Sequence, residues 1–185
     1  MMPPSMGDAA TTPGRGDEAP QPPDKNEVAA ILDEVSMLLE LDGSNTYEVR
    51  AYQNAARAVA MIEGDLGEMA RAGALGGIPG LGKTLVGRIT ELVTTGHLAI
   101  YDELLAKVPP GLRQMLRISG LGPKRVRQIS QTLNITTLAE LRAAAERGEI
   151  AGLPGFGAKS QENLLKGIDF LERHADRYLF PVAEE

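Results

Sequence analysis

The chain has 185 residues, no cysteine, two histidines and a formal net charge of −6 at pH 7. The lack of cysteine excludes disulfide bonds and thiolate zinc sites, and His97 and His174 are too far apart in sequence to indicate a metal centre. The longest apolar runs fall well short of the ~20 residues that a membrane helix needs, so we expect no membrane partner and a cytoplasmic location.

The first residues differ in composition from the rest of the chain. Residues 1–23 contain six prolines together with glycine, serine, threonine and charged residues, and they show no apolar period. This composition predicts a disordered tail. A helix should begin at Asp24, because Asp24 and Glu27 have the spacing of a capping box. Apolar residues then mark one face of that helix: Val28, Ile31, Leu32, Val35, Leu38 and Leu39.

The following segment predicts two more helices. Residues 42–45 read Asp-Gly-Ser-Asn and should end the first helix. The inward face of a second helix should consist of Val49, Tyr52, Ala56, Val59 and either Met61 or Ile62. A short third helix should end at Gly73. The remainder shows no run of alternating β-branched residues, so the sequence predicts an all-α helical bundle.

An internal repeat is the most informative feature of the sequence. Residues 78–83, 118–124 and 153–159 each read apolar, Pro or Ser, Gly, apolar, Gly, followed by a basic residue one or two places later. Apolar residues at helical spacing follow each segment. One Gly-x-Gly is weak evidence, because helices often end in glycine, but three copies in register predict three helix-hairpin-helix motifs.

This pattern suits contact with a phosphate backbone. The first glycine permits a tight turn, and the second stands where the next helix begins, where backbone N–H groups lack partners and the macrodipole is positive. Such contacts read phosphates and not base edges, so they predict DNA binding without sequence specificity. The predicted DNA-binding residues are Gly80, Gly82, Lys83, Thr84, Gly120, Gly122, Lys124, Arg125, Arg127, Gly155, Gly157 and Lys159.

Charge supports the second hairpin more than the third. Residues 111–133 hold five basic residues and no acidic one, which predicts a basic face on an acidic protein, with an ordinary solvated helix surface as the alternative. Around the third hairpin Glu162, Asp169 and Glu172 offset the basic residues, so packing against protein is the alternative there. The apolar residues between the glycines should fill the core beneath each hairpin: Leu81, Leu121 and Phe156.

From about Asn26 onward, the chain resembles the N-terminal part of a bacterial family X DNA polymerase. The resemblance is carried by residues 26–32, 49–52, 54–57, 78–83, 116–124 and 153–157. It implies a small helical domain that grips the downstream side of a DNA gap and a fingers-like domain that grips the primer side. The expected divisions are a tail at 1–23, the helical domain at 24–97, the fingers-like domain at 98–177 and a lead-in to a palm domain at 178–185.

The resemblance also implies partners and location. We expect a monomer that binds gapped or nicked duplex in base excision repair, located with the nucleoid, with repair proteins as further partners. The Gly-Ser motif and paired aspartates of the palm are missing, so no polymerase centre is expected in this chain. A truncated polymerase, an excised fragment and a free-standing DNA-binding protein all stay open.

Two further properties of family X relatives bear on this sequence. The nucleophilic lysine of the animal lyases falls on Arg88, which cannot form a Schiff base, and their phosphate-holding lysines fall on Glu48 and Thr84, so lyase activity is not expected. Animal relatives also hold Na⁺ or K⁺ on hairpin carbonyls, and no other cofactor is expected. The matching carbonyls belong to Gly76, Ile78, Leu81, Leu116, Ile118 and Leu121.

Two functions from other classes are alternatives to DNA binding. Residues 77–84 match the phosphate-loop pattern G-x-x-x-x-G-K-[ST], but that chemistry needs a strand before the loop, and residues 68–76 read as helix and turn. A helical protein-interaction adaptor in DNA repair is the other alternative, and the acidic balance and the neutral third hairpin support it.

Overall fold

The computed structural model describes residues 22–174, and within this range the regular structure is entirely helical. This confirms the predicted all-α class. The elements are α1 (Lys25–Asp42), α2 (Thr46–Ala60), α3 (Leu66–Arg71), the 3₁₀ helix η1 (Ala74–Gly77), α4 (Lys83–Thr95), α5 (Ala99–Lys107), α6 (Pro110–Met115), α7 (Pro123–Leu133), α8 (Leu138–Glu146) and α9 (Ala158–Arg173). The expected palm lead-in lies outside the described residues, as does the expected tail except for Pro22 and Pro23.

The first helix begins and ends as its sequence predicts. Asp24 accepts hydrogen bonds from the N–H groups of Asn26 and Glu27, and the Glu27 carboxylate accepts one from the Asp24 N–H at 2.8 Å, so the capping box is present. The helix ends at Gly43, whose φ of +91° lies in the left-handed region. Of the two candidates at the end of α2, Ile62 is buried, whereas Met61 is 83% exposed.

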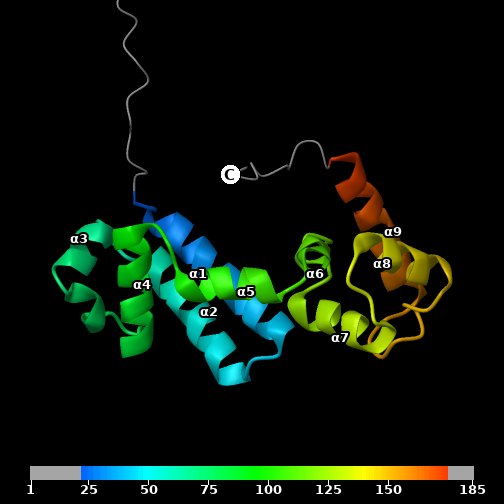
Figure 1. Cartoon of the computed structure of the whole chain (residues 1–185), viewed down its shortest axis with the longest axis horizontal. Helices are drawn as coiled ribbons and strands as arrows, with labels where there is room; N and C mark the ends of the chain where they lie inside the picture. The colour runs from blue at the N-terminus through cyan, green and yellow to red at the C-terminus, as the bar shows by residue number, and fades with distance from the viewer. Residues whose placement is uncertain (1–21, 175–185) are drawn as a thin grey trace, which may run out of the picture.

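The helices form two groups along the long axis of the molecule (Figure 1). In one, α1 and α2 pack side by side, with α3, η1 and α4 at their outer end. In the other, α6 and α7 precede α8 and α9. Helix α5 belongs with α1, because the Tyr101 hydroxyl donates to Glu34 at 2.9 Å and Lys107 pairs with Asp42 at 2.9 Å. Burial, followed by the nearby Glu34 carboxylate, raises the pKa of Tyr101 to about 12.

The expected domain boundary at residue 98 therefore falls just before a helix that packs on the N-terminal group.

Chain segments in the second group approach one another closely. A side chain at Gly111 would collide with the backbone of Thr136, and one at Gly167 would lie 2.6 Å from Ile118. Arg142 of α8 also pairs with Asp169 of α9 at 2.6 Å. These contacts hold α6, α8 and α9 as one packed unit around the second and third hairpins.

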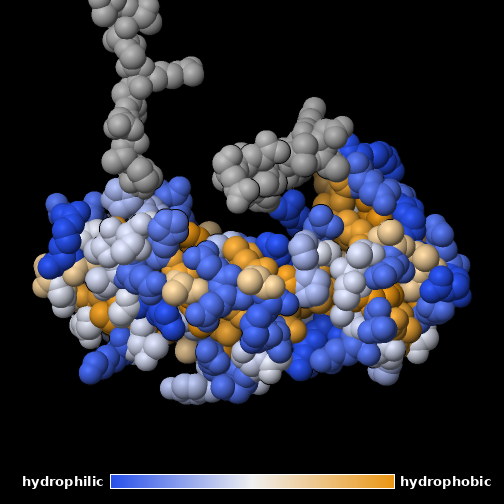
Figure 2. All heavy atoms as spheres, viewed as in Figure 1, coloured by the Kyte–Doolittle hydropathy of each residue, from blue (hydrophilic) through white to orange (hydrophobic). Residues whose placement is uncertain are grey.

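The surface of the molecule is mixed. Figure 2 shows hydrophobic residues in separate areas of this face, one around α5 and another beside α9, among charged and polar ones. No helix in residues 22–174 has the length and apolar character needed to cross a bilayer.

Candidate nucleic-acid interface

The three repeated segments fold into the same turn. The Leu81 N–H donates to Ile78 O at 3.2 Å, and the equivalent Leu121–Ile118 and Phe156–Leu153 bonds both measure 3.0 Å. The first glycine of each segment is left-handed, with φ of +89° at Gly80, +81° at Gly120 and +80° at Gly155. A residue with a side chain is strained in this conformation, so the repeat has a glycine there for conformational reasons.

The second glycine of each segment begins a helix that lacks a side-chain cap. Gly82, Gly122 and Gly157 are the N-caps of α4, α7 and α9, and no side chain in the described range accepts from the first-turn N–H groups of these helices. Four other helix starts have a side-chain cap: Asp24, Asn45, Asp65 and Thr137 each accept such a bond for α1, α2, α3 and α8. Helices α5 and α6 have no such N-cap bond, although Glu91 accepts from the Ala99 N–H at the start of α5. The helices after the hairpins thus keep unsatisfied donors at their positive ends.

The hairpin glycines also border open space. A Cβ atom built on any of the six would meet no atom within 4 Å in the described part of the chain: Gly80, Gly82, Gly120, Gly122, Gly155 and Gly157. Gly111 and Gly167, by contrast, are required by packing. Packing within the described chain does not require the second glycines, and the space over them is open to a group from outside, as it also is at Gly76, Gly77 and Gly87.

The predicted lysines lie exposed beside these turns. Lys83, Lys124 and Lys159 occupy the first turns of α4, α7 and α9, and their side chains make no hydrogen bond or ion pair with any residue between 22 and 174. Thr84 is exposed next to Lys83. Three ammonium groups are therefore available to an anion from outside.

The predicted arginines occupy different surroundings. Arg125 donates to the carbonyls of Gly120 and Gly155, both at 3.3 Å, and its guanidinium lies 5.1 Å from the centre of the Phe156 ring. It therefore links the second hairpin to the third. Arg127 is half-buried and lies against Gly43 at the end of α1, and its Nε has no hydrogen-bond partner among the described residues.

The third hairpin differs from the first two. Its N-cap Gly157 has φ −152°, whereas Gly82 and Gly122 have −72° and −78°. The Gln128 side-chain amide of α7 donates to Pro154 O at 2.8 Å, so α7 bonds directly to this turn. Of the three residues expected to fill the core beneath the hairpins, Leu81 and Leu121 are buried, at 7% and 4% exposed. Phe156 is only half-buried.

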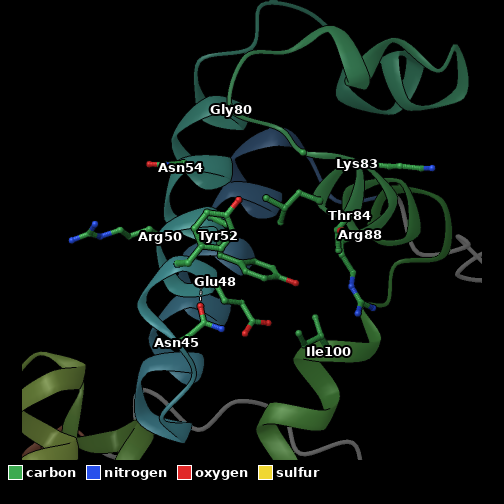
Figure 3. Close-up of a pocket in the computed structure, with 14 residues that line it drawn as sticks. Asn45, Glu48, Arg50, Tyr52, Asn54, Gly80, Lys83, Thr84, Arg88 and Ile100 are labelled. Carbon is green, nitrogen blue, oxygen red and sulfur yellow. Dashed lines mark hydrogen bonds between the residues drawn. The ribbon is translucent and has the colours of Figure 1, made fainter.

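A groove of about 740 Å³ lies between α2 and α4, beside the first hairpin. In Figure 3, Glu48 and Arg88 extend into this space from opposite sides, whereas Arg50 and Lys83 point outward. The sequence predictions did not include the groove residues Tyr47, Arg50 and Asn54. Their spacing could have indicated the groove, because these three residues are three and four positions apart and therefore share one face of α2.

The groove contains the position of the lyase nucleophile. Arg88 occupies it and forms an ion pair with Glu91 at 3.6 Å. Burial raises the pKa of Tyr52, which is 4% exposed in the core, while nearby Arg88 opposes that shift. Neither side chain supplies the neutral amine that Schiff-base chemistry needs. The phosphate-loop alternative also loses its basis, because α3 and η1 precede Gly80 where that fold requires a strand.

Comparison with known proteins agrees with this geometry. Residues 23–98 match the family model of a helix-hairpin-helix domain, and residues 112–169 match that of a SAM-like helix-hairpin-helix tandem. The chain is 30% identical over 158 residues to the DNA polymerase/3′-5′ exonuclease PolX of Bacillus subtilis, which covers 85% of this chain and 27% of that protein.

A second group of relatives matches a shorter stretch. The Holliday junction branch migration complex subunit RuvA of Leptothrix cholodnii is 32% identical over 88 residues, which is 48% of this chain and 46% of that subunit. RuvA of a Polaromonas species is 33% identical over 89 residues, again 48% of this chain and 46% of the subunit. The chain thus spans about a quarter of PolX and just under half of RuvA. Two helix-hairpin-helix family models therefore match most of the described residues, and the chain is similar in sequence to part of PolX.

Proposed function

We propose that this chain binds DNA without sequence specificity by holding backbone phosphates at its glycine hairpins. The observation behind the proposal is that α4, α7 and α9 begin at bare glycine N-caps, whereas α1, α2, α3 and α8 have side-chain caps. Helices α5 and α6 also lack an N-cap side-chain bond, but they begin after Leu98 and Pro109 and not after a glycine. A phosphate oxygen can accept from the first-turn N–H groups and gains from the positive end of the helix dipole.

The exposed lysines complete each contact. Lys83 and Lys124 stand within one turn of the bare N-caps of α4 and α7, where their charge adds to that of the helix end. These groups recognise the phosphate and not the base, so the affinity should vary little with sequence and fall as salt rises. The relatives support this reading, since PolX is named as a DNA polymerase and RuvA as a subunit acting at Holliday junctions.

We propose further that the preferred substrate is gapped or nicked duplex, and that the chain is the DNA-gripping part of a repair polymerase. The first hairpin belongs to the helix group around α1, and the second and third belong to the group around α7. Two groups with separate phosphate contacts can hold the two sides of a break. A monomer that acts at the chromosome, with Na⁺ or K⁺ on the hairpin carbonyls, belongs to the same proposal.

The proposal is tested by fluorescence anisotropy with labelled duplexes that are gapped, nicked or intact, at two salt concentrations. We expect roughly micromolar binding that weakens with salt and is tightest for the gap. A four-way junction of the same length tests the alternative suggested by RuvA. No binding at low salt would contradict DNA binding and favour the protein-interaction adaptor, while equal binding to all duplexes would remove the preference for breaks.

A further inference from the structure

The end of α1 has a particular geometry. The Ser44 N–H donates to Leu39 O at 2.9 Å and the Gly43 N–H donates to Glu40 O at 3.3 Å, which is the hydrogen-bond pattern of a Schellman motif with glycine in the left-handed region. The last turn of α1 contains no basic residue. The partial negative charge of this helix end therefore has no cation from its own helix.

Arg127 of α7 lies at this helix end. If Gly43 carried a Cβ atom, that atom would lie 2.5 Å from Nη2 of Arg127 and 3.0 Å from its Cζ. Helices α1 and α7 pack against each other at this point, although one belongs to each helix group. The guanidinium brings a positive charge to this helix end from the opposite group, in addition to Lys107 of α5, which pairs with Asp42 at 2.9 Å. A Cβ atom at position 43 would force the end of the Arg127 side chain to shift.

The contact is close to the second hairpin. Gly122 is the N-cap of α7, and Arg127 follows little more than one turn later. On the other side, α1 is the main partner of α2, which forms one wall of the groove beside the first hairpin. The Gly43–Arg127 contact thus connects α7, which begins at the second hairpin, to α1, which reaches the first hairpin through its packing on α2 and α4.

We propose that Arg127 is a positioning residue that fixes the first and second hairpins relative to each other. The two hairpins then bind phosphates on one DNA molecule together only at a defined separation. The effect on DNA binding rests on the proposed function, whereas the Gly43–Arg127 contact does not depend on it. A rigid connection favours DNA breaks of one length, since linked sites gain affinity only where the connection matches their separation.

The connection can be measured without DNA. The chain has no cysteine, so spin labels can be placed at two exposed positions by Met61→Cys in the first group and Ala139→Cys in the second. We expect a narrow distance distribution in this background. Gly43→Ala and Arg127→Met should broaden or shift it, whereas Arg127→Lys should restore most of the narrow distribution.

Gly96→Ala is the matched control for Gly43→Ala. Gly96 also ends a helix with positive φ, at +74°, but its Cβ would meet nothing within 4 Å in the described chain. Both substitutions cause backbone strain, and only Gly43→Ala displaces Arg127. Combining Gly43→Ala with Arg127→Met should give little more than either change alone. An unchanged distance in both Gly43→Ala and Arg127→Met would overturn the proposal, and so would an equal change in Gly96→Ala.

The consequence for binding is tested with duplexes whose gaps run from one to six nucleotides. For the parent chain we expect one preferred gap length. Arg127→Met should weaken binding at that length about tenfold and flatten the dependence on gap length, because independent sites no longer have a fixed separation. Uniform weakening at every gap length would contradict a positioning role. If the parent chain binds no DNA, the proposed function fails while the spin-label distances still decide the contact.

Discussion

The first two hairpins and the third have the same sequence pattern and the same turn, but not the same surroundings. Leu81 and Leu121 are buried beneath exposed N-cap glycines. No side chain between residues 22 and 174 bonds to the first turn at residues 78–82, and the second turn accepts one bond, from Arg125 to Gly120 O at 3.3 Å. The third turn accepts bonds from Arg125 and Gln128 of α7, and its Phe156 is half-buried beneath the Arg125 guanidinium. The third hairpin is partly occupied by its own protein.

This difference shows that a motif specifies a backbone conformation, while its neighbours decide what the motif can bind. The Gly-x-Gly pattern alone produces the left-handed first glycine and the uncapped helix start. The basic residues of the repeat are exposed at all three hairpins, whereas Arg125 and Arg127, further along α7, contact other parts of the protein. We therefore expect the first two hairpins to contribute more to DNA binding than the third.

The largest expected effect concerns the apolar residue between the glycines. Leu121→Ala removes a side chain that is 4% exposed and should lower the free energy of unfolding by about 3 kcal/mol. Phe156→Ala should cost about 1–2 kcal/mol, because the ring is half-buried and loses chiefly its contact with Arg125. Urea unfolding followed by circular dichroism measures both. Equal losses would show that the two hairpins are equally packed.

The next effect is on DNA affinity. Gly82→Val and Gly122→Val place a side chain in open space over the first-turn amides, and each should weaken binding about tenfold by blocking a charge-assisted hydrogen bond. Gly157→Val should weaken it by less. Gly87→Val is the control, since it also enters open space but lies inside α4. Fluorescence anisotropy at low salt measures the four variants, and equal losses at all three hairpins would refute the ranking.

A smaller effect is expected where the second hairpin bonds to the third. Arg125→Ala removes the bonds to Gly120 O and Gly155 O, so hydrogen exchange across residues 153–157 should become several times faster. Lys124→Ala is the control, because Lys124 neighbours Arg125 but makes no contact with the third hairpin. Unchanged exchange in Arg125→Ala would mean that Gln128 alone holds the turn.

The smallest effect is expected at single lysines. Lys83→Ala should lower the slope of log affinity against log salt by about 1, because one phosphate contact is lost. Lys159→Ala should change the slope less, since the third turn already accepts bonds from Arg125 and Gln128 and is therefore less open to a phosphate. A series of anisotropy titrations at four salt concentrations gives both slopes, and a larger change for Lys159→Ala would reverse the comparison.

The sequence predicted what depends on local pattern. The capping box at Asp24, the apolar face of α1 and the turns at Gly80, Gly120 and Gly155 are formed by residues within a few positions of each other. It also predicted burial of Leu81 and Leu121, because a residue enclosed by a tight turn faces the core.

The remaining features depend on contacts between distant residues. Arg127 meets Gly43 across more than eighty positions, and Gln128 meets Pro154 across twenty-six. The helical periodicity of the sequence does not indicate which distant residues come into contact. The sequence of residues 111–133 consequently predicted a single basic face. In the structure Lys124 is exposed, Arg125 bonds to the third hairpin and Arg127 lies against Gly43. The groove beside α2 likewise arises from helix packing and not from a motif.

The central claim is that the uncapped amides of the hairpins bind phosphates. The most direct test is a titration of the ¹⁵N-labelled chain with gapped duplex, followed by amide chemical shifts. We expect salt-dependent shifts at Gly82, Lys83 and Thr84 and at Gly122 and Lys124, smaller shifts at the start of α9, and none at the capped starts of α1 and α8. Shifts confined to lysine-bearing surfaces elsewhere, with the hairpin amides unmoved, would contradict this claim.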